Sequence, residues 1–248
     1  MSNGYKQNFL TNVIFNLDFP TLKNYQDKFK EFQTLIKVNF PVIEEIKGFA
    51  IEHKVSNEGK PESSVKEIVT FVLNNKEKTK TVSLQENKLI FNFKDYIKFE
   101  EFQKTLKLVL DSLFNVYPEI ISRKIGLRYI NQINFDNGSL FDWNNLIESK
   151  LLTSIQFIDN KDELSRHLSL IEITKDEYQL RFQYGFYNSM YPSPIIKKEF
   201  MLDLDCFSSE SFENSSEILK KVEIFNKIIG EMFEKSISNG LREIMRKE

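Results

Sequence analysis

The chain has 248 residues, of which 41% are hydrophobic and 28% are charged, and it contains 23 Phe and 9 Tyr. A chain of this length and aromatic content can bury a large core without disulfides, so the composition excludes a disordered protein. The formal net charge of −2 gives no reason to expect nucleic acid or an anionic membrane surface as the partner.

The N-terminal residues carry no cationic start followed by an apolar stretch and a small-residue cleavage site, so no export signal is predicted. No window approaches the roughly 18 uninterrupted apolar residues that a membrane-spanning helix needs. The single cysteine, Cys206, cannot form an intramolecular disulfide, and a reducing compartment therefore fits the sequence. We expect a cytoplasmic protein with no membrane segment.

An extended run at residues 8–19 opens the chain and leads through Pro20 into a predicted helix. The apolar residues of that helix recur at helical spacing: Leu22, Tyr25, Phe29, Phe32 and Ile36. Strand-like runs follow at 46–55, 66–74 and 79–93, the last interrupted by the turn-like sequence QENK. A second amphipathic helix is predicted over 98–117 and ends before Pro118. Residues 1–118 therefore read as β-α-βββ-α.

The second half begins with a predicted strand at 120–135 and a short helix at 142–155. Three strands and a long C-terminal helix follow, with the strands at 166–174, 178–187 and 197–206 and the helix capped by Ser215 or Ser216. Residues 119–248 therefore repeat the order β-α-βββ-α. We interpret the chain as an α+β fold of two pseudo-repeated β-α-βββ-α halves, in which antiparallel sheets pack against long helices. Coincidence is the alternative, and the two halves could form one integrated domain.

The order of elements and the missing motifs argue against familiar enzyme scaffolds. Clustered strands between helices differ from the repeated βα units of doubly wound sheets and (β/α)₈ barrels. The sequence has no GxGxxG, GxxxxGK[ST] or GxSxG motif and only eight glycines. Its two histidines, His53 and His167, lie outside any catalytic or metal-binding signature. We therefore assign no catalytic residue and no cofactor.

The strand at 197–206 places three carboxylates on one face, because Glu199, Asp203 and Asp205 alternate with apolar residues. Three carboxylates can hold Mg²⁺ and support phosphodiester hydrolysis, so a metal-dependent nuclease is one hypothesis. A solvated acidic face of an antiparallel sheet predicts the same alternation, and we favour that interpretation. No metal site is assigned. Cys206 lies on the apolar face and is expected to be a buried, inert thiol.

The segment GLRYINQINF, residues 126–135, alternates like a strand but carries polar side chains on both faces. We therefore predict a central strand that is covered on both sides. Asn131 lies among apolar neighbours, and a buried amide needs hydrogen-bond partners, so its expected role is structural and fixes the strand register. Tyr129 is assigned the same structural role.

All six arginines lie after residue 122, in a chain that otherwise prefers lysine. A planar guanidinium suits both bidentate salt bridges and anion recognition. Arg128 and Arg181, with an aromatic ring such as Tyr184, could enclose a nucleotide-like anion. A small-anion sensor is therefore another hypothesis, whereas structural salt bridges are the simpler explanation of the arginines.

Three segments together resemble a known family: GLRYINQI at 126–133, the Y-x-x-F-E-E-F segment from Tyr96 to Phe102, and NFP from Asn39 to Pro41. They are similar to segments of a sporadically distributed family of uncharacterised bacterial proteins of about this length. The core of the resemblance is R-Y-x-N, here Arg128, Tyr129 and Asn131. It covers most of the chain and carries no catalytic residue with it. Sporadic occurrence is typical of genes in mobile or defence cassettes, so the resemblance implies an anti-phage or toxin–antitoxin setting.

The C-terminal segment carries more apolar residues than a short sheet is expected to cover: Ile228, Ile229, Met232, Phe233, Ile237, Leu241, Ile244 and Met245. A protein partner or a second copy of the chain would bury the excess. We therefore expect a non-catalytic binding or regulatory protein, a partner subunit in a bacterial defence or toxin–antitoxin cassette, with recognition in the second half. The alternatives are the nuclease built on Glu199, Asp203 and Asp205 and the anion sensor built on Arg128 and Arg181.

Overall fold

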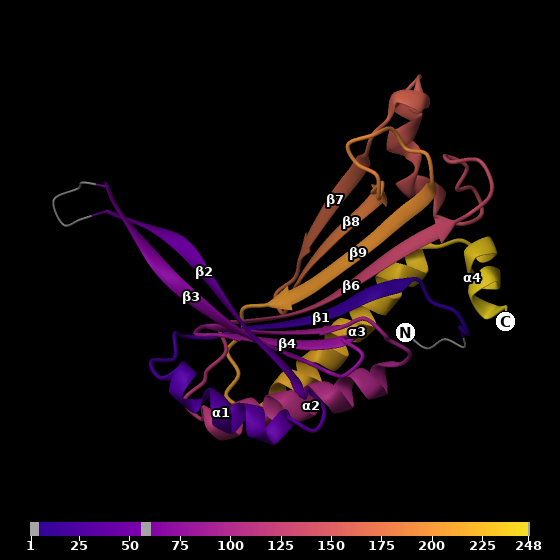
Figure 1. The fold of residues 1–248 in the computed structure, drawn as a ribbon. Coiled ribbons are helices and arrows are strands. Elements are labelled where there is room, and N and C mark those ends of the chain that lie inside the picture. Colours follow the sequence, from indigo (N-terminus) through magenta and orange to yellow (C-terminus); the bar gives the residue numbers. More distant parts are fainter. Residues whose placement is uncertain (1–4, 56–60, 248) are drawn as a thin grey trace.

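The computed structural model describes the backbone of residues 5–55 and 61–247, and the side chains of these residues except 50–55, 61, 62 and 64. The side chain of His53 is therefore outside the described residues. Within them the fold is α+β, with one nine-stranded antiparallel sheet and four α-helices. The strand order in the sheet is β2-β3-β4-β5-β1-β6-β9-β8-β7 (Figure 1).

The elements have the following bounds. The strands are β1 Leu10–Asp18, β2 Val42–Val55, β3 Pro61–Asn74, β4 Lys80–Gln85, β5 Lys88–Phe93, β6 Lys124–Phe135, β7 His167–Thr174, β8 Gln179–Phe186 and β9 Lys198–Ser208. The helices are α1 Tyr25–Ile36, α2 Phe99–Val116, α3 Ser215–Ser236 and α4 Asn239–Arg246.

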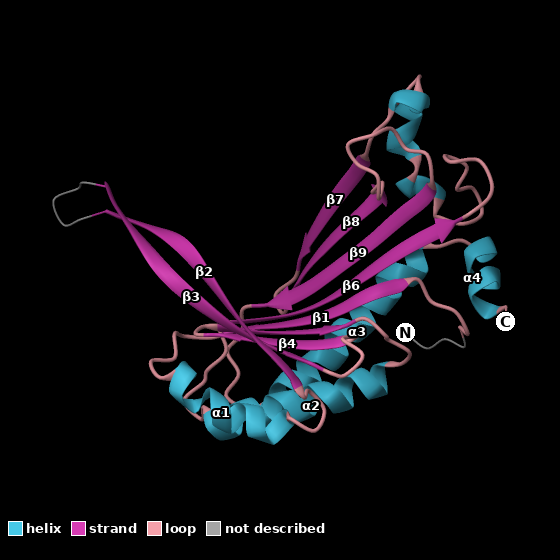
Figure 2. Cartoon of the chain, viewed as in Figure 1, coloured by secondary structure: helices cyan, strands magenta, loops and turns pink. Residues whose placement is uncertain are grey.

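Helices α1, α2 and α3 lie on one face of the sheet and leave the opposite face open (Figure 2). α1 contacts α2, α2 contacts α3, and α3 contacts β6 and β9. The apolar stripe of α2 shows why it packs there, since Phe102, Leu106 and Val109 recur at helical spacing and are all fully buried. Buried side chains from the helices and the sheet form one core cluster. No helix in the described parts of the chain is both long and apolar enough to cross a membrane.

β1 and β6 are the central pair of the sheet and join the two halves of the chain. They run antiparallel with Val13 opposite Tyr129, so the sheet is continuous across the boundary between residues 118 and 119. The first half contributes five strands, because the predicted run at 79–93 is two strands separated by a turn, whereas the second half contributes four. The order β-α-βββ-α is therefore not repeated strictly, and the duplication stays a prediction.

The predicted helix at 142–155 is wrong. Asn145 has a φ of +63°, which an α-helix of L-residues cannot contain. The chain here forms short 3₁₀ turns at Ser149–Leu151 and Thr153–Phe157 instead. Trp143 and Ile147 are nevertheless buried, so the apolar residues indicated burial correctly although the helical period was misleading.

The expectation that β6 is covered on both faces is also wrong. One face is buried beneath the helices and consists of Leu127, Tyr129, Asn131 and Ile133. On the other face Arg128, Ile130 and Gln132 are only half-buried, because no helix covers the open side of the sheet. The polar residues of the motif therefore lie in two different environments.

The C-terminal segment forms two helices where one was predicted. Asn214 caps α3, because its side-chain oxygen accepts from the backbone N–H of Glu217 at 3.0 Å, and neither Ser215 nor Ser216 is the cap. α4 then packs back against the N-terminal segment, where the Met245 carbonyl accepts from the N–H of Lys6 at 2.9 Å. Much of the apolar excess is thereby buried by the chain itself, including Ile229, Phe233, Ile237, Leu241 and Met245.

β2 and β3 extend away from the rest of the sheet as a two-stranded arm (Figure 1). β2 pairs with β3 along its whole length, from Val42 opposite Asn74 to Val55 opposite Pro61. β4 pairs only with residues 71–74 of β3. Among the described residues, the outer part of the arm therefore has no neighbouring strand on either side.

Candidate functional site

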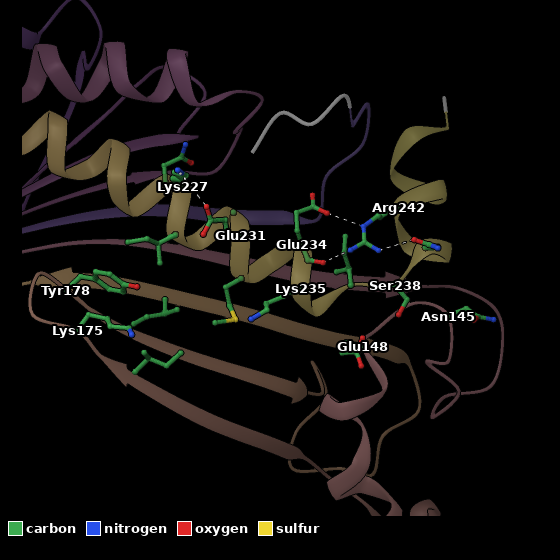
Figure 3. Close-up of a pocket in the computed structure, with 18 residues that line it drawn as sticks. Asn145, Glu148, Lys175, Tyr178, Lys227, Glu231, Glu234, Lys235, Ser238 and Arg242 are labelled. Carbon is green, nitrogen blue, oxygen red and sulfur yellow. Dashed lines mark hydrogen bonds and ion pairs between the residues drawn. The ribbon is translucent and has the colours of Figure 1, made fainter.

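A groove of about 1270 Å³ separates α3 from strands β7 and β8 (Figure 3). Lys175 and Tyr178 lie at one end of it, and Asn145 and Glu148 lie at the other. Its apolar lining comes from both walls: Ile173 and Leu180 from the strands, and Ile228, Met232 and Ile237 from α3 and its C-terminal end. The volume exceeds the roughly 300–1,000 Å³ of an ordinary small-molecule pocket and suits a polypeptide segment.

Backbone contacts at the junction of α3 and α4 form the end wall of this groove. The N–H of Glu148 donates to the Ser236 carbonyl, and the N–H of Ser238 donates to the Leu146 carbonyl, both at 2.9 Å. A Cβ atom at Gly240 would lie 2.5 Å from the carbonyl oxygen of Asn145, so only glycine permits this close approach. The loop that replaces the predicted helix is therefore held firmly against the C-terminal helices.

The rim of the groove carries charges of both signs. Lys227 lies 4.0 Å from Glu231, and the Arg242 Nε lies 3.1 Å from Glu234. The ammonium groups of Lys175 and Lys235 line the groove without a hydrogen bond or ion pair to the described residues. Both are exposed, one on the strand wall and the other on the helix wall. The groove therefore combines apolar and polar lining residues with two cations, Lys175 and Lys235, and one anion, Glu148, that form no ion pair with the described residues.

A buried chain of polar groups links the groove to the R-Y-x-N and Y-x-x-F-E-E-F segments. The Tyr129 hydroxyl donates to the Oδ1 of Asn226, which lines the groove, at 2.8 Å, and lies 3.3 Å from the Tyr96 hydroxyl. Burial raises the pKa of Tyr96 to about 12 and the pKa of Tyr129 well above its ordinary value, so both phenols stay protonated at physiological pH. The R-Y-x-N and Y-x-x-F-E-E-F segments, distant in sequence, thus meet in the core behind the groove.

Asn131 is buried and contacts the neighbouring strand. Its side-chain Nδ2 donates to the backbone carbonyl of Leu202 in β9 at 3.2 Å, and Leu202 is also its partner in the strand register. This hydrogen bond satisfies a group that would otherwise be costly to bury. It would be lost if β6 slipped relative to β9, so the contact is of the kind expected from a residue that fixes register.

Arg128 and Arg181 belong to a row of alternating charges on the open face of the sheet. The register places Arg128 of β6 opposite Asp205 of β9, Asp205 opposite Arg181 of β8, and Arg181 opposite Glu172 of β7. Together with Asp203, the two arginines and Asp205 line a pocket of about 200 Å³. The structure therefore brings together two of the residues proposed for anion binding.

Each of these arginines has a carboxylate partner within the chain. Arg128 donates to both oxygens of Asp203, with Nε 2.8 Å from Oδ1 and Nη2 2.5 Å from Oδ2, and Arg181 Nε lies 2.9 Å from Glu172. Asp205 also faces both arginines, and its burial raises its pKa although the arginines oppose the shift. An anion would have to displace these carboxylates. Tyr184 does not line the pocket, since it lies beside Phe182 on the opposite face of β8.

The expected solvated acidic face is wrong, because two of its three carboxylates are buried. Glu199 and Asp203 are each 5% exposed. Glu199 accepts from the backbone N–H and the hydroxyl of Ser189, both at 2.7 Å, whereas Asp203 is bound by Arg128. The described residues contain no group of three His, Cys, Asp or Glu side chains that could hold a metal ion. The carboxylates thus serve separate contacts, and the nuclease hypothesis has no site among them.

The sequence matches no protein-family model, and a comparison with curated proteins found no match. The groove itself was only partly foreseen from the sequence. The apolar excess at Ile228 and Met232 pointed to the α3 wall, but nothing in the sequence linked it to Leu180 on β8 or to Lys175 in the turn between β7 and β8. The contribution of Lys235 was missed because an exposed lysine in a lysine-rich chain carries no distinguishing signal.

Proposed function

We propose that the chain is a non-catalytic binding protein that holds a segment of a partner protein in the groove between α3 and strands β7 and β8. The observation that carries the proposal is the groove itself, in which Ile228 and Met232 remain only half-buried among polar lining residues although most of the C-terminal segment is buried. Apolar grooves of this kind accept the apolar face of a helix or an extended segment.

Among the lining charges that form no ion pair with the described residues, Lys175 and Lys235 outnumber Glu148, and they define the chemistry of the segment. Lys175 and Lys235 lie on opposite walls, so acidic side chains on the bound segment would be attracted to both. Ile228 and Met232 are one helical turn apart and face the groove together, which suits apolar side chains on the same segment. The proposed ligand is therefore an apolar segment that carries acidic residues.

The resemblance of the GLRYINQI segment to a sporadically distributed bacterial family supports a cellular setting for this proposal. We assign the chain to a defence or toxin–antitoxin cassette as the partner subunit. In such a setting the bound segment would belong to a protein encoded beside this chain, which makes neighbouring gene products the first candidates to test.

The proposal is tested by native mass spectrometry of the tagged chain purified from its host, followed by affinity measurements on two matched pairs of variants. Ile228→Glu and Lys235→Glu alter the groove, whereas Ile224→Glu and Lys220→Glu make the same changes at exposed positions of α3 outside it. We expect each groove variant to weaken partner binding by about tenfold or more, which corresponds to about 1.4 kcal/mol. The two control variants should bind like the parent chain.

Two results would overturn this function. One is a chain that retains no protein partner when purified from its host. The other is a partner that binds the groove variants as tightly as the control variants, because the segment must then lie elsewhere. Thermal unfolding of all four variants shows whether a loss of binding reflects loss of the fold.

A further inference from the structure

We propose that the β2–β3 arm pairs with the same arm of a second copy of the chain, edge to edge along β2, around a two-fold axis at Ile46. This contact lies outside the groove and does not depend on the function proposed for it. The inference rests on three features of the arm: its unpaired edge, its exposed apolar residues and the arrangement of its charges.

β2 is the terminal strand of the sheet, and no other strand of the described residues pairs with its outer edge. Natural proteins usually shield such edges, since unpaired backbone N–H and C=O groups invite pairing with another strand. Residues 61–70 of β3 pair with β2 alone, so this part of the arm is only two strands wide. Two-stranded ribbons are marginally stable in water, and three or more strands are needed for independent stability. Pairing along β2 would convert two such arms into one four-stranded sheet.

Three large apolar side chains on β2 are exposed, at intervals of three residues. Ile43 is 38% exposed, Ile46 is 51% exposed and Phe49 is 74% exposed. Strand alternation places Ile43 and Phe49 on one face of the arm and Ile46 on the other, so β2 exposes apolar side chains on both faces, as interaction surfaces do. In an antiparallel pair centred on Ile46, each Ile46 lies opposite its own copy and Ile43 lies opposite Phe49 of the second copy. All three residues would thus gain an apolar neighbour in one register.

The charges of β2 are complementary in this same register. Glu45 of one copy lies opposite Lys47 of the other, and the two-fold axis forms this pair twice. Within one copy Lys47 lies 3.8 Å from Glu45 and 3.5 Å from Glu67. The Glu45 and Lys47 side chains are still 50% and 60% exposed, so a second copy can reach both. An axis at position 45 would place two Glu45 carboxylates opposite one another, and an axis at position 47 would do the same with two Lys47 ammonium groups. Like charges opposite one another destabilise a strand pair. Charge complementarity therefore selects a second copy of this chain as the partner and fixes its register.

A cysteine at position 46 tests the axis directly. Residues opposite one another in an antiparallel pair have Cα atoms about 4.5–5.5 Å apart, within the range that a disulfide spans. Cys206 is fully buried, and burial raises the pKa of its thiol to about 12, so it does not compete for oxidation. Under mild oxidation we expect Ile46→Cys to form a reducible covalent dimer, whereas Ile224→Cys, at an exposed site on α3, should remain mostly uncrosslinked.

Charge exchange tests the register. Sedimentation velocity should give the parent chain a mass of twice 29.4 kDa as its concentration rises. Lys47→Glu places like charges opposite one another twice and should weaken the dimer by about tenfold or more. Adding Glu45→Lys to Lys47→Glu restores opposite charges and should restore dimerisation. A parent chain that stays monomeric at all concentrations would overturn the proposal. So would a dimer that neither responds to Lys47→Glu nor crosslinks through Ile46→Cys, since it would use another face.

Discussion

The two ends of the nine-stranded sheet differ in the side chains that they expose. At the β7 end, the open face carries Arg128, Asp205, Arg181 and Glu172 in a row of alternating sign, so each charge has a neighbour of opposite sign in the same chain. At the β2 end, Ile46 and Phe49 are 51% and 74% exposed; β7 also exposes Leu170 and Ile171, but Phe49 is more exposed than either. Charges that are paired within the chain do not require opposite charges from a partner, whereas association buries exposed apolar groups and is therefore favoured. The charged row is therefore expected to stabilise the fold, whereas the exposed apolar residues of β2 are expected to favour association with a second copy.

The largest expected contrast is between two phenylalanines. Phe186 is 2% exposed and packs against Phe141 and Phe200, whereas Phe49 on the arm is 74% exposed. We expect Phe186→Ala to lower the free energy of unfolding by about 3–5 kcal/mol and Phe49→Ala to change it by less than about 0.5 kcal/mol. Urea unfolding on dilute protein measures both, since association would otherwise add to the result. If the two variants lose the same free energy of unfolding, Phe49 must be buried in solution.

The next contrast is between the two arginines of the charged row. Arg128→Gln leaves the buried Asp203 carboxylate without its bidentate partner and should cost about 2–4 kcal/mol. Arg181→Gln breaks a pair whose two side chains are both more than half exposed and should cost less than about 1 kcal/mol.

The double variant Arg128→Gln with Asp203→Asn separates a lost ion pair from lost packing. Because it removes the uncompensated charge, it should be more stable than Arg128→Gln alone. If the two arginine variants lose the same stability, the pair with Asp203 contributes no more than an exposed salt bridge.

The buried tyrosines predict a fall in stability at alkaline pH. The pKa of Tyr96 rises from the ordinary value near 10 to about 12, so the protonated phenol favours the folded state. Its full contribution is present below pH 10 and is lost as the pH rises toward about 12, with a maximum of roughly 2–3 kcal/mol. The free energy of unfolding, measured with urea at several pH values between 9 and 12, should therefore fall less steeply with pH for Tyr96→Phe than for the exposed control Tyr191→Phe. Parallel slopes for the two variants would contradict the assignment.

The smallest expected effect concerns Asn131. Asn131→Ala removes one buried hydrogen bond, to the Leu202 carbonyl, and should lower the free energy of unfolding by about 1 kcal/mol. Gln132→Ala, on the half-buried face of the same strand, should change it by less than about 0.5 kcal/mol. Chemical denaturation of both variants tests the difference, and an Asn131→Ala protein that unfolds like the parent chain would remove the register role.

The sequence predicted elements best where one face is buried and the period is regular. The stripes of α1 and α2 and the alternation of β1 and β8 were sufficient, because burial of a single face imposes a fixed period. The segment at 142–155 failed because its apolar residues are buried from turns, and the positive φ of Asn145 leaves no trace in hydrophobic periodicity.

The candidate sites were harder to predict because they join distant residues. Alternation placed Arg128 and Arg181 on consistent strand faces, but only the strand order shows that β9 lies between them and that Asp203 binds Arg128. The same lack of long-range information made the buried carboxylates look solvated. The groove combines a strand wall and a helix wall that are separated by more than 40 residues of sequence, and no local pattern connects them.

The central position of β1 has a consequence for synthesis on the ribosome. β1 can pair with β5 once residue 93 has emerged, but its other edge must wait for β6, which ends at residue 135. β6 in turn waits for β9, which begins at residue 198. Contacts across such sequence separations close late and slow folding, and unpaired edges of partly made chains are prone to aggregate. A nascent chain that ends before β6 exposes one unpaired edge of β1, so slow translation through 94–135 is expected to lower the yield of folded protein.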